Sequence, residues 1–293
     1  MNPIAKVFLI AAGVVVVGVS VWGWLQVPGL LRENRFADLE SHHRQCFDQR
    51  ASASTVAACS WVLENATLTP RLRARALLNR GRAYSLAGQY ARATVDFDGA
   101  LRLAPGKHDV LAVDALADLA YAEARLGEYG RAMAYADRAV ERAPDNPNGY
   151  GMRGFVHAYE GQYATAAEDY DSVIRLRPDD SRGYTMRCFY RAIAGALPGA
   201  LKDCDKALAL KPQLAAALRA RGFVHFKMGQ YALARDDYDS AVLVDSNSAA
   251  AFYMRGLAKL KLGGTTGGEA DIAEAKSLDP DVAERFAGYG VMP

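Results

Sequence analysis

The sequence lacks the features that mark several large classes of protein. Its net charge is only +2 over 293 residues, so no overall field of one sign indicates nucleic acid or a strongly charged ligand. Long alternating runs of Val, Ile and Thr are absent after residue 25, which argues against an extensive β-sheet. Hydrophobic residues make up 51% of the chain, which is enough to bury a core. The bulk of the chain is therefore predicted to be helical.

Motifs for catalysis and metal binding are also missing. The sequence has no G-x-S-x-G, C-x-x-C or H-E-x-x-H spacing. His157 and His225 lie 68 positions apart in equivalent sequence contexts, and we interpret them as hydrogen-bonded core residues. Only His42, His43 and Cys46 are close enough in sequence to suggest an enzyme or a metal site, and no base with an orienting partner accompanies them. We expect no catalytic residue, no cofactor, no metal and no nucleic acid.

One long uncharged run occurs near the N-terminus. Residues 7–27 hold no charged side chain, and Trp22 and Trp24 lie at the far end of the run. A helix of this length crosses the hydrocarbon layer of roughly 30 Å, and indole rings suit its interface. The alternative is a cleaved signal peptide, whose apolar region is shorter, at about 7–15 residues, and ends in a small-x-small site. We predict a retained anchor over residues 1–29, although the flanking charges do not fix its orientation.

Beyond residue 70 the sequence repeats itself. Residues 153–171 (RGFVHAYEGQYATAAEDYD) and 221–239 (RGFVHFKMGQYALARDDYD) match at 13 of 19 positions. A glycine lies in the middle of each unit, and apolar residues on both sides follow helical spacing. The pattern predicts an all-α protein with a helical hairpin at 30–69, six helix–turn–helix units and a capping segment at 281–293. The six units are expected at about 74–107, 113–146, 147–180, 181–214, 215–248 and 249–280.

Oppositely charged residues recur symmetrically about each turn. Arg153 and Asp169 lie equally far from the turn glycine, so two antiparallel helices would bring them face to face. The second unit has Leu119 and Tyr135 at these positions, so both charges are replaced together. We interpret the pairs as structural salt bridges rather than catalytic groups. They are Arg80 with Asp96, Arg153 with Asp169, Arg187 with Asp203, Arg221 with Asp237 and Arg255 with Asp271.

The four cysteines form two pairs of the same kind. Cys188 and Cys204 occupy facing positions in the fourth unit, and Cys46 and Cys59 flank the turn predicted in the N-terminal hairpin. Together with an upstream membrane segment, this arrangement favours two disulfides and an oxidising compartment. The alternative is that each cysteine is a small buried residue with a free thiol.

The repeated unit resembles the tetratricopeptide repeat (TPR). The shared features are the 34-residue period, G-x-x-[YH] in the first helix, G-[QED]-Y-x-x-A at the turn and a closing Pro, as in GFVHAYEGQYATAAEDYDSVIRLRP at residues 154–178. The resemblance covers roughly 210 of the 293 residues, although the units around Gly127, Gly195 and Gly263 depart from the pattern. The CFDQ…AACSWVLE region also resembles the start of exported bacterial TPR proteins.

The resemblance implies a right-handed superhelical solenoid whose first helices line a concave groove for a peptide or partner helix. We therefore expect a non-enzymatic, membrane-anchored scaffold with its repeats in the periplasm and an acidic or aromatic-containing partner segment. A structural envelope protein that self-assembles or forms oligomers is the alternative function, and an enzyme that uses the N-terminal hairpin is a further alternative. Three of the expected groove residues, Phe155, Phe189 and Phe223, recur at the repeat spacing and are also candidates for core between repeats. The full expected set is Arg82, Tyr121, Arg125, Phe155, Tyr159, Phe189, Phe223, Phe226 and Lys227.

Overall fold

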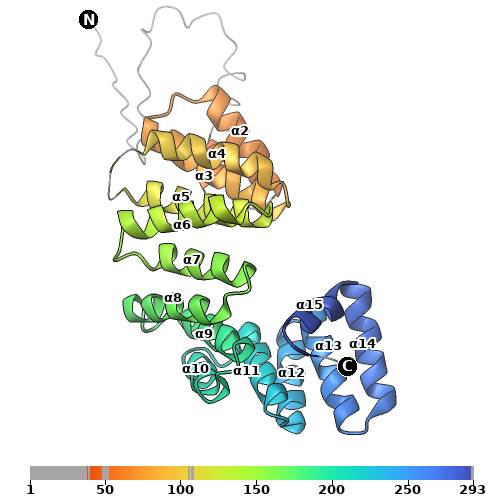
Figure 1. The fold of residues 1–293 in the computed structure, drawn as a ribbon. Coiled ribbons are helices and arrows are strands. Elements are labelled where there is room, and N and C mark those ends of the chain that lie inside the picture. The colour runs from red at the N-terminus through yellow and green to blue at the C-terminus, as the bar shows by residue number, and fades with distance from the viewer. Residues whose placement is uncertain (1–37, 39, 48–52, 105, 107–108, 292–293) are drawn as a thin grey trace, which may run out of the picture. The chain divides into compact units, whose positions relative to one another are not determined.

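The computed structural model describes residues 38, 40–47, 53–104, 106 and 109–291. All regular structure in these ranges is helical, and no strand occurs among them, so the predicted all-α fold is confirmed (Figure 1). The predicted anchor at residues 7–27 lies outside the described residues. Within those residues, no helix is long and apolar enough to cross a membrane.

The helices divide into two compact units, Met1–Pro144 and Asp145–Pro293. The N-terminal unit contains helical residues 40–47, then α2 (Ala53–Asn65), α3 (Pro70–Leu86), α4 (Tyr90–Leu103), α5 (Val110–Arg125) and α6 (Tyr129–Arg142). The C-terminal unit contains α7 (Pro147–Tyr159), α8 (Tyr163–Leu176), α9 (Ser181–Ile193), α10 (Leu197–Leu210), α11 (Ala215–Lys227), α12 (Tyr231–Val244), α13 (Ala249–Lys261), α14 (Thr265–Leu278) and α15 (Val282–Gly288) (Figure 1). The predicted repeats correspond to the six hairpins from α3–α4 to α13–α14.

Each of these hairpins turns on a glycine with left-handed backbone. Gly161 has φ of +76°, and its N–H donates to the carbonyl of Ala158 at 3.1 Å. The next N–H, that of Gln162, donates to His157 O at 2.8 Å. This pair of bonds ends a helix in a left-handed residue, a conformation that costs glycine far less than other residues. The same positive φ occurs at Gly88, Gly127, Gly195, Gly229 and Gly263.

Close packing inside a hairpin depends on a second glycine. A Cβ at Gly154 in α7 would lie 3.0 Å from the Tyr170 ring and 3.0 Å from the carbonyl oxygen of Ala166, both in α8. The two helices therefore approach more closely than a larger residue would allow. The Tyr170 hydroxyl in turn donates to Gly151 O at 3.2 Å, which fixes the ring across the hairpin.

The first helix extends beyond the predicted repeat 74–107 at its N-terminal end. Helix α3 starts at Pro70, four positions before the expected residue 74. Thr69 caps it, because the Thr69 hydroxyl oxygen accepts a hydrogen bond from the Leu72 N–H at 3.3 Å. Proline suits the first helical position, where its missing N–H is not needed. Local capping therefore sets this boundary, and the repeat spacing does not.

The first helices of successive hairpins contact one another within each unit. Helix α3 contacts α5 in the N-terminal unit, while α9 contacts α11 and α11 contacts α13 in the C-terminal unit. We call the surface made by the first helices of a unit its first-helix face. Helix α15 packs against α13 and α14 at the end of the C-terminal unit (Figure 1).

Candidate functional site

An arginine–aspartate pair joins the two helices of five hairpins. Arg153 in α7 lies 2.7 Å from Asp169 in α8, and Asp169 is only 5% exposed. Burial of the carboxylate and the two-pronged contact distinguish this pair from a surface ion pair. The other pairs measure 2.8 Å for Arg80–Asp96, 2.5 Å for Arg187–Asp203, 2.7 Å for Arg221–Asp237 and 2.7 Å for Arg255–Asp271.

Arg187, Arg221 and Arg255 also reach the preceding hairpin, a link that the sequence analysis missed. Arg187 lies 2.7 Å from Asp171, which is two positions after the buried Asp169. The D-x-D spacing in the second helix of four hairpins was the available signal, because a second aspartate on the exposed side of that helix points to the next repeat. Equivalent contacts join Asp205 to Arg221 at 3.1 Å and Asp239 to Arg255 at 3.0 Å.

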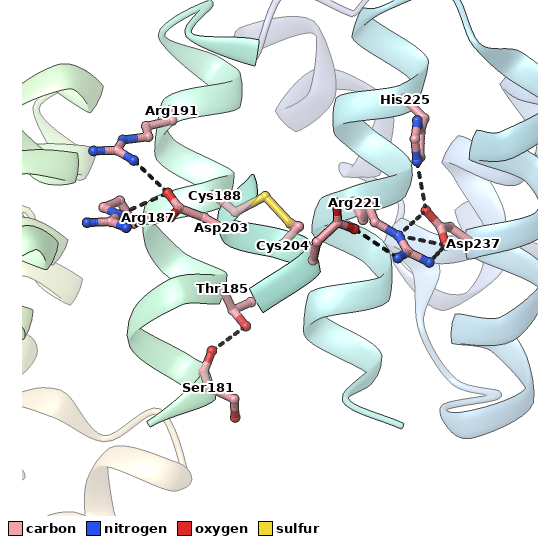
Figure 2. Close-up of a disulfide and its surroundings, with 11 residues drawn as sticks. Ser181, Thr185, Arg187, Cys188, Arg191, Asp203, Cys204, Arg221, His225 and Asp237 are labelled. Carbon is pink, nitrogen blue, oxygen red and sulfur yellow. Dashed lines mark hydrogen bonds and ion pairs between the residues drawn. A yellow bond between two sulfur atoms is a disulfide. The ribbon is translucent and has the colours of Figure 1, made fainter. Parts of the chain in front are cut away.

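Two disulfides bridge facing helices at the positions that the cysteine pattern favours. Cys188 in α9 is bonded to Cys204 in α10, with 5.5 Å between their Cα atoms (Figure 2). Cys46 is bonded to Cys59 in α2, with 4.7 Å between their Cα atoms. All four side chains are buried. The Cys188–Cys204 disulfide lies beside the Arg187–Asp203 pair (Figure 2). The two helices of the fourth hairpin are therefore joined by a covalent and an ionic link at neighbouring positions.

Histidine side chains make hydrogen bonds or ring contacts within the protein. Nδ1 of His157 lies 2.8 Å from the side-chain oxygen of Gln162, and Nδ1 of His225 lies 2.7 Å from that of Gln230. Both rings are hydrogen-bonded, as predicted, but they are half-buried and not part of the core. His42 stacks on Trp61 with 4.6 Å between ring centroids.

Cys46 is one of the three residues that suggested an enzyme, and its sulfur is bonded to Cys59 in a disulfide. Across the part of the chain that the structure describes, no three His, Cys, Asp or Glu side chains gather into a metal-binding group. The described part of the N-terminal hairpin uses Cys46 in a disulfide and His42 in a ring stack on Trp61.

The first-helix face of the N-terminal unit is charged. Arg82 in α3 lies 2.6 Å from Asp118 and 3.3 Å from Asp114, both in α5. Burial raises the pKa of Asp118 from its usual 3.8 to about 6, although Arg82 acts in the opposite direction. Arg82 was expected to contact a partner, and instead it joins two hairpins through these carboxylates.

An aromatic group lies farther along this face. The Tyr121 ring meets the Tyr90 ring edge-on, with 6.1 Å between centroids, and the Arg125 guanidinium lies 4.9 Å from the Tyr90 centroid. Arg125 is exposed and Tyr121 is half-buried. Both residues are thus located where a partner segment can reach part of their side chains.

The first-helix face of the C-terminal unit is aromatic. Phe155 and Tyr159 contact each other with 4.7 Å between ring centroids, and Tyr159 is 40% exposed. Phe189 and Phe223 follow on the next two first helices, with 5.7 Å between centroids. Phe223 is only 1% exposed. Phe223 belongs to the first-helix face and is nevertheless buried, because residues of the C-terminal segment cover its ring.

Two further predicted groove residues have other partners. Phe226 is 9% exposed and packs edge-on against Tyr231 of its own hairpin, with 5.2 Å between ring centroids. It is therefore no longer a candidate for binding a partner. Lys227 donates a hydrogen bond from Nζ to the carbonyl of Tyr289 at 3.4 Å. Lys227 therefore binds the chain's own C-terminal segment.

Comparison with solved structures gives the same fold at low sequence identity. A tetratricopeptide repeat protein from Parabacteroides merdae aligns with a TM-score of 0.65 at 17% identity, over 88% of this chain and 100% of that one. The APC/C hetero-tetramer Cut9–Hcn1 aligns with a TM-score of 0.66 at 17% identity, over 86% of this chain and 47% of that one. Pseudomonas aeruginosa pilF aligns with a TM-score of 0.58 at 18% identity, over 74% of this chain and 98% of that one.

Comparison with curated proteins yields no match. Three sequence profiles, each described as tetratricopeptide repeat, match residues 74–107, 113–155, and 152–215 with 219–283. These matches cover most of the hairpin array and more than half of the chain. The chain therefore belongs to the tetratricopeptide repeat family.

Proposed function

We propose that this protein is a non-enzymatic scaffold that binds a protein or peptide segment on its first-helix faces. TPR repeats are protein–protein interaction modules, and stacked hairpins offer long continuous surfaces for this purpose. The observation that carries the proposal is the gathering of aromatic and cationic side chains on these faces, including exposed Arg125 and partly exposed Tyr159. Such side chains suit an acidic or aromatic-containing segment.

The proposal includes a membrane tether and a periplasmic location for the repeats. Residues 7–27 are uncharged over a length that suits a single-pass helix. The two buried disulfides suit an oxidising compartment. Alkaline extraction of membranes should leave the full chain in the pellet and release a variant that lacks residues 7–27. Release of both forms would contradict the tether.

Partner binding is tested by photo-crosslinking in the source cell from two positions in the same hairpin. A photoreactive residue at Tyr159 lies on the first-helix face, and one at Glu168 lies exposed on α8, the second helix. We expect a discrete crosslinked protein from position 159 and none from position 168. The captured protein, once purified, should bind Tyr159→Ala at least about tenfold more weakly than wild type. Equal capture from both positions would contradict the assignment of the face.

A further inference from the structure

The C-terminal segment of the chain lies on the first-helix face of the C-terminal unit. Phe286 in α15 contacts Phe223 in α11 and Tyr253 in α13, with ring centroids 6.1 Å and 5.6 Å away. Tyr289 contacts Phe189 in α9 edge-on at 5.5 Å. Two aromatic side chains of one short segment therefore touch three successive first helices.

Local sequence places these two rings on one side of the segment. Phe286 and Tyr289 are three positions apart, the spacing at which helical side chains are neighbours. Helix α15 ends at Gly288, and two residues later Gly290 has φ of +76° and donates its N–H to Ala287 O at 2.9 Å. The N–H of Val291 donates to Phe286 O at 3.0 Å, and Val291 is buried. This helix ending turns Val291 back toward the face as a third apolar anchor.

A cation of the face also recognises the backbone of the segment. Lys227 donates from Nζ to the carbonyl of Tyr289 at 3.4 Å, and the same Nζ lies 5.8 Å from the centroid of the Phe223 ring. Carbonyls at a helix C-terminus carry partial negative charge, so a cation is favourable there. The contact uses aromatic anchors and one charged donor, a combination typical of a peptide bound in a groove.

The segment fills the face incompletely. A cavity of about 290 Å³ remains between it and the helices below, with Phe189, Phe223, Phe286 and Tyr289 among its walls. Tyr238 also lines this cavity and is 1% exposed, and its hydroxyl has no hydrogen-bond partner among the described residues.

The C-terminal segment can also dissociate from the first-helix face at little cost to the rest of the unit. Helix α15 has seven residues, a length that is unstable without tertiary contacts. Its outer side is polar or small, since Glu284, Arg285 and Ala287 are exposed. Removal of the segment therefore exposes the aromatic face without breaking the Arg–Asp pairs or the disulfide that hold the hairpins together.

We propose that residues 282–291 are an exchangeable internal ligand, and that the face beneath them binds a partner helix with two aromatic side chains three positions apart. The partner displaces the segment, inserts its aromatic pair between Phe189, Phe223 and Tyr253, and presents a carbonyl to Lys227. This inference rests on the proposed scaffold function and adds the chemistry of the partner and the form of its competitor.

The test uses a fluorescent peptide of residues 279–293 of this chain as the probe, with the full-length protein. In wild type the tethered segment competes at an effective concentration in the millimolar range, so the peptide should bind weakly. Phe286→Ala with Tyr289→Ala should bind the peptide at least about tenfold more tightly. The exposed-side variant Glu284→Ala is the matched control and should behave as wild type. When Phe189→Ala is added to the double variant, its affinity for the peptide should return to the wild-type level or below.

A second variant protects the test against misfolding. Gly290→Val places a β-branched residue at positive φ, which disrupts the end of the segment and leaves every wall residue intact. It should also gain affinity for the peptide, while circular dichroism and thermal melting show a folded protein. The proposal is overturned if both open variants fold and neither binds the peptide more tightly than wild type. Crosslinking from position 159 would still report on the scaffold function independently.

Discussion

The two units are built from the same hairpin and present different first-helix faces. The N-terminal unit carries Arg82 between two carboxylates, whereas the C-terminal unit carries Phe189 and Phe223 beneath the chain's own C-terminal segment. Turn glycines and contacts within the hairpin fix the frame in both. The difference shows that positions on the first-helix face can change without changing the frame.

The units also differ in how their hairpins are held. In the second hairpin of the N-terminal unit, Leu119 is fully buried where the others have arginine, and Tyr135 packs against the same apolar cluster. The hairpin folds with the same glycine turn at Gly127. An apolar pair therefore replaces an ion pair at this level, as expected if a buried salt bridge and well-packed apolar residues stabilise a fold similarly.

The largest expected effect concerns the two aspartates of one D-Y-D motif in the C-terminal unit. Asp169→Ala removes the buried carboxylate that pairs with Arg153 across the hairpin and should cost about 3–5 kcal/mol of unfolding free energy. Asp171→Ala is the matched control, because half of that side chain is exposed, and should cost less than about 1 kcal/mol. Urea denaturation of the two variants measures the difference.

The double change Arg153→Leu with Asp169→Tyr copies the apolar pair of the N-terminal unit. It should cost less than Asp169→Ala alone, since both charges of the pair are removed together and apolar side chains take their places. If the double variant were as unstable as the single one in the same urea titration, the structural reading of the pair would be wrong.

The disulfides allow each unit to be weakened separately. Replacing Cys46 and Cys59 by serine, or Cys188 and Cys204 by serine, opens loops of similar length, with sequence separations of 13 and 16. Each double variant should lose about 2–4 kcal/mol. Hydrogen exchange read by mass spectrometry should show faster opening in the N-terminal unit for the first and in the C-terminal unit for the second. Faster exchange of both units in either variant would argue against separate units.

The pH dependence of stability should have opposite signs in the two units. The pKa of Asp118 is raised by burial to about 6, so the folded N-terminal unit holds a proton that the unfolded chain releases near 3.8. Its unfolding free energy should therefore fall as pH rises from about 4 to 6, by at most about 3 kcal/mol. Asp118→Asn should remove this slope in denaturation curves, and the exposed-residue control Glu141→Gln should keep it.

Asp271 in the C-terminal unit behaves in the opposite way. Burial alone would raise its pKa, but hydrogen bonds from Arg255 and Lys259 hold the pKa below the usual 3.8. Its contribution to stability is present above the usual value and is lost as pH falls through the lowered one. Acid titration followed by hydrogen exchange should show the C-terminal unit losing protection below about pH 4. A gain in protection there would contradict the assignment.

The smallest expected effect compares two tyrosines in equivalent positions. Tyr170→Phe removes a hydrogen bond to Gly151 and should cost about 1 kcal/mol. Tyr238→Phe removes a hydroxyl that has no partner among the described residues and should be neutral or slightly stabilising. Thermal melts of the two variants distinguish them, and an equal loss for both would mean that Tyr238 is bonded in solution.

Features with a local cause or a periodic one were predictable from the sequence. The turn glycines, the Arg153–Asp169 pair and the pairing of Cys188 with Cys204 all follow from symmetry about a single turn. The fold class followed from the 34-residue period. Each of these contacts joins residues at a fixed spacing, so one correct hairpin predicts the rest.

Contacts between hairpins that are made only once among the described residues were not predictable in the same way. The pairing of Arg82 with Asp118 depends on how α3 and α5 lie together, and no repeated spacing encodes it. The contact of Lys227 with Tyr289 joins residues 62 positions apart and is made once. No periodic signal therefore predicted that residues 282–291 pack on the first-helix face. The aromatic residues at 286 and 289 were the only sign that this segment contacts an apolar surface.

The most direct test of this account is hydroxyl-radical footprinting of the first-helix faces, read by mass spectrometry. In wild type we predict that Phe223 is protected and Tyr159 is modified, because the C-terminal segment covers only the first of the two. Phe286→Ala with Tyr289→Ala should raise modification of Phe189 and Phe223 several-fold and leave Tyr121 of the N-terminal unit unchanged. Modification of Phe223 in wild type at the level of Tyr159 would contradict the account.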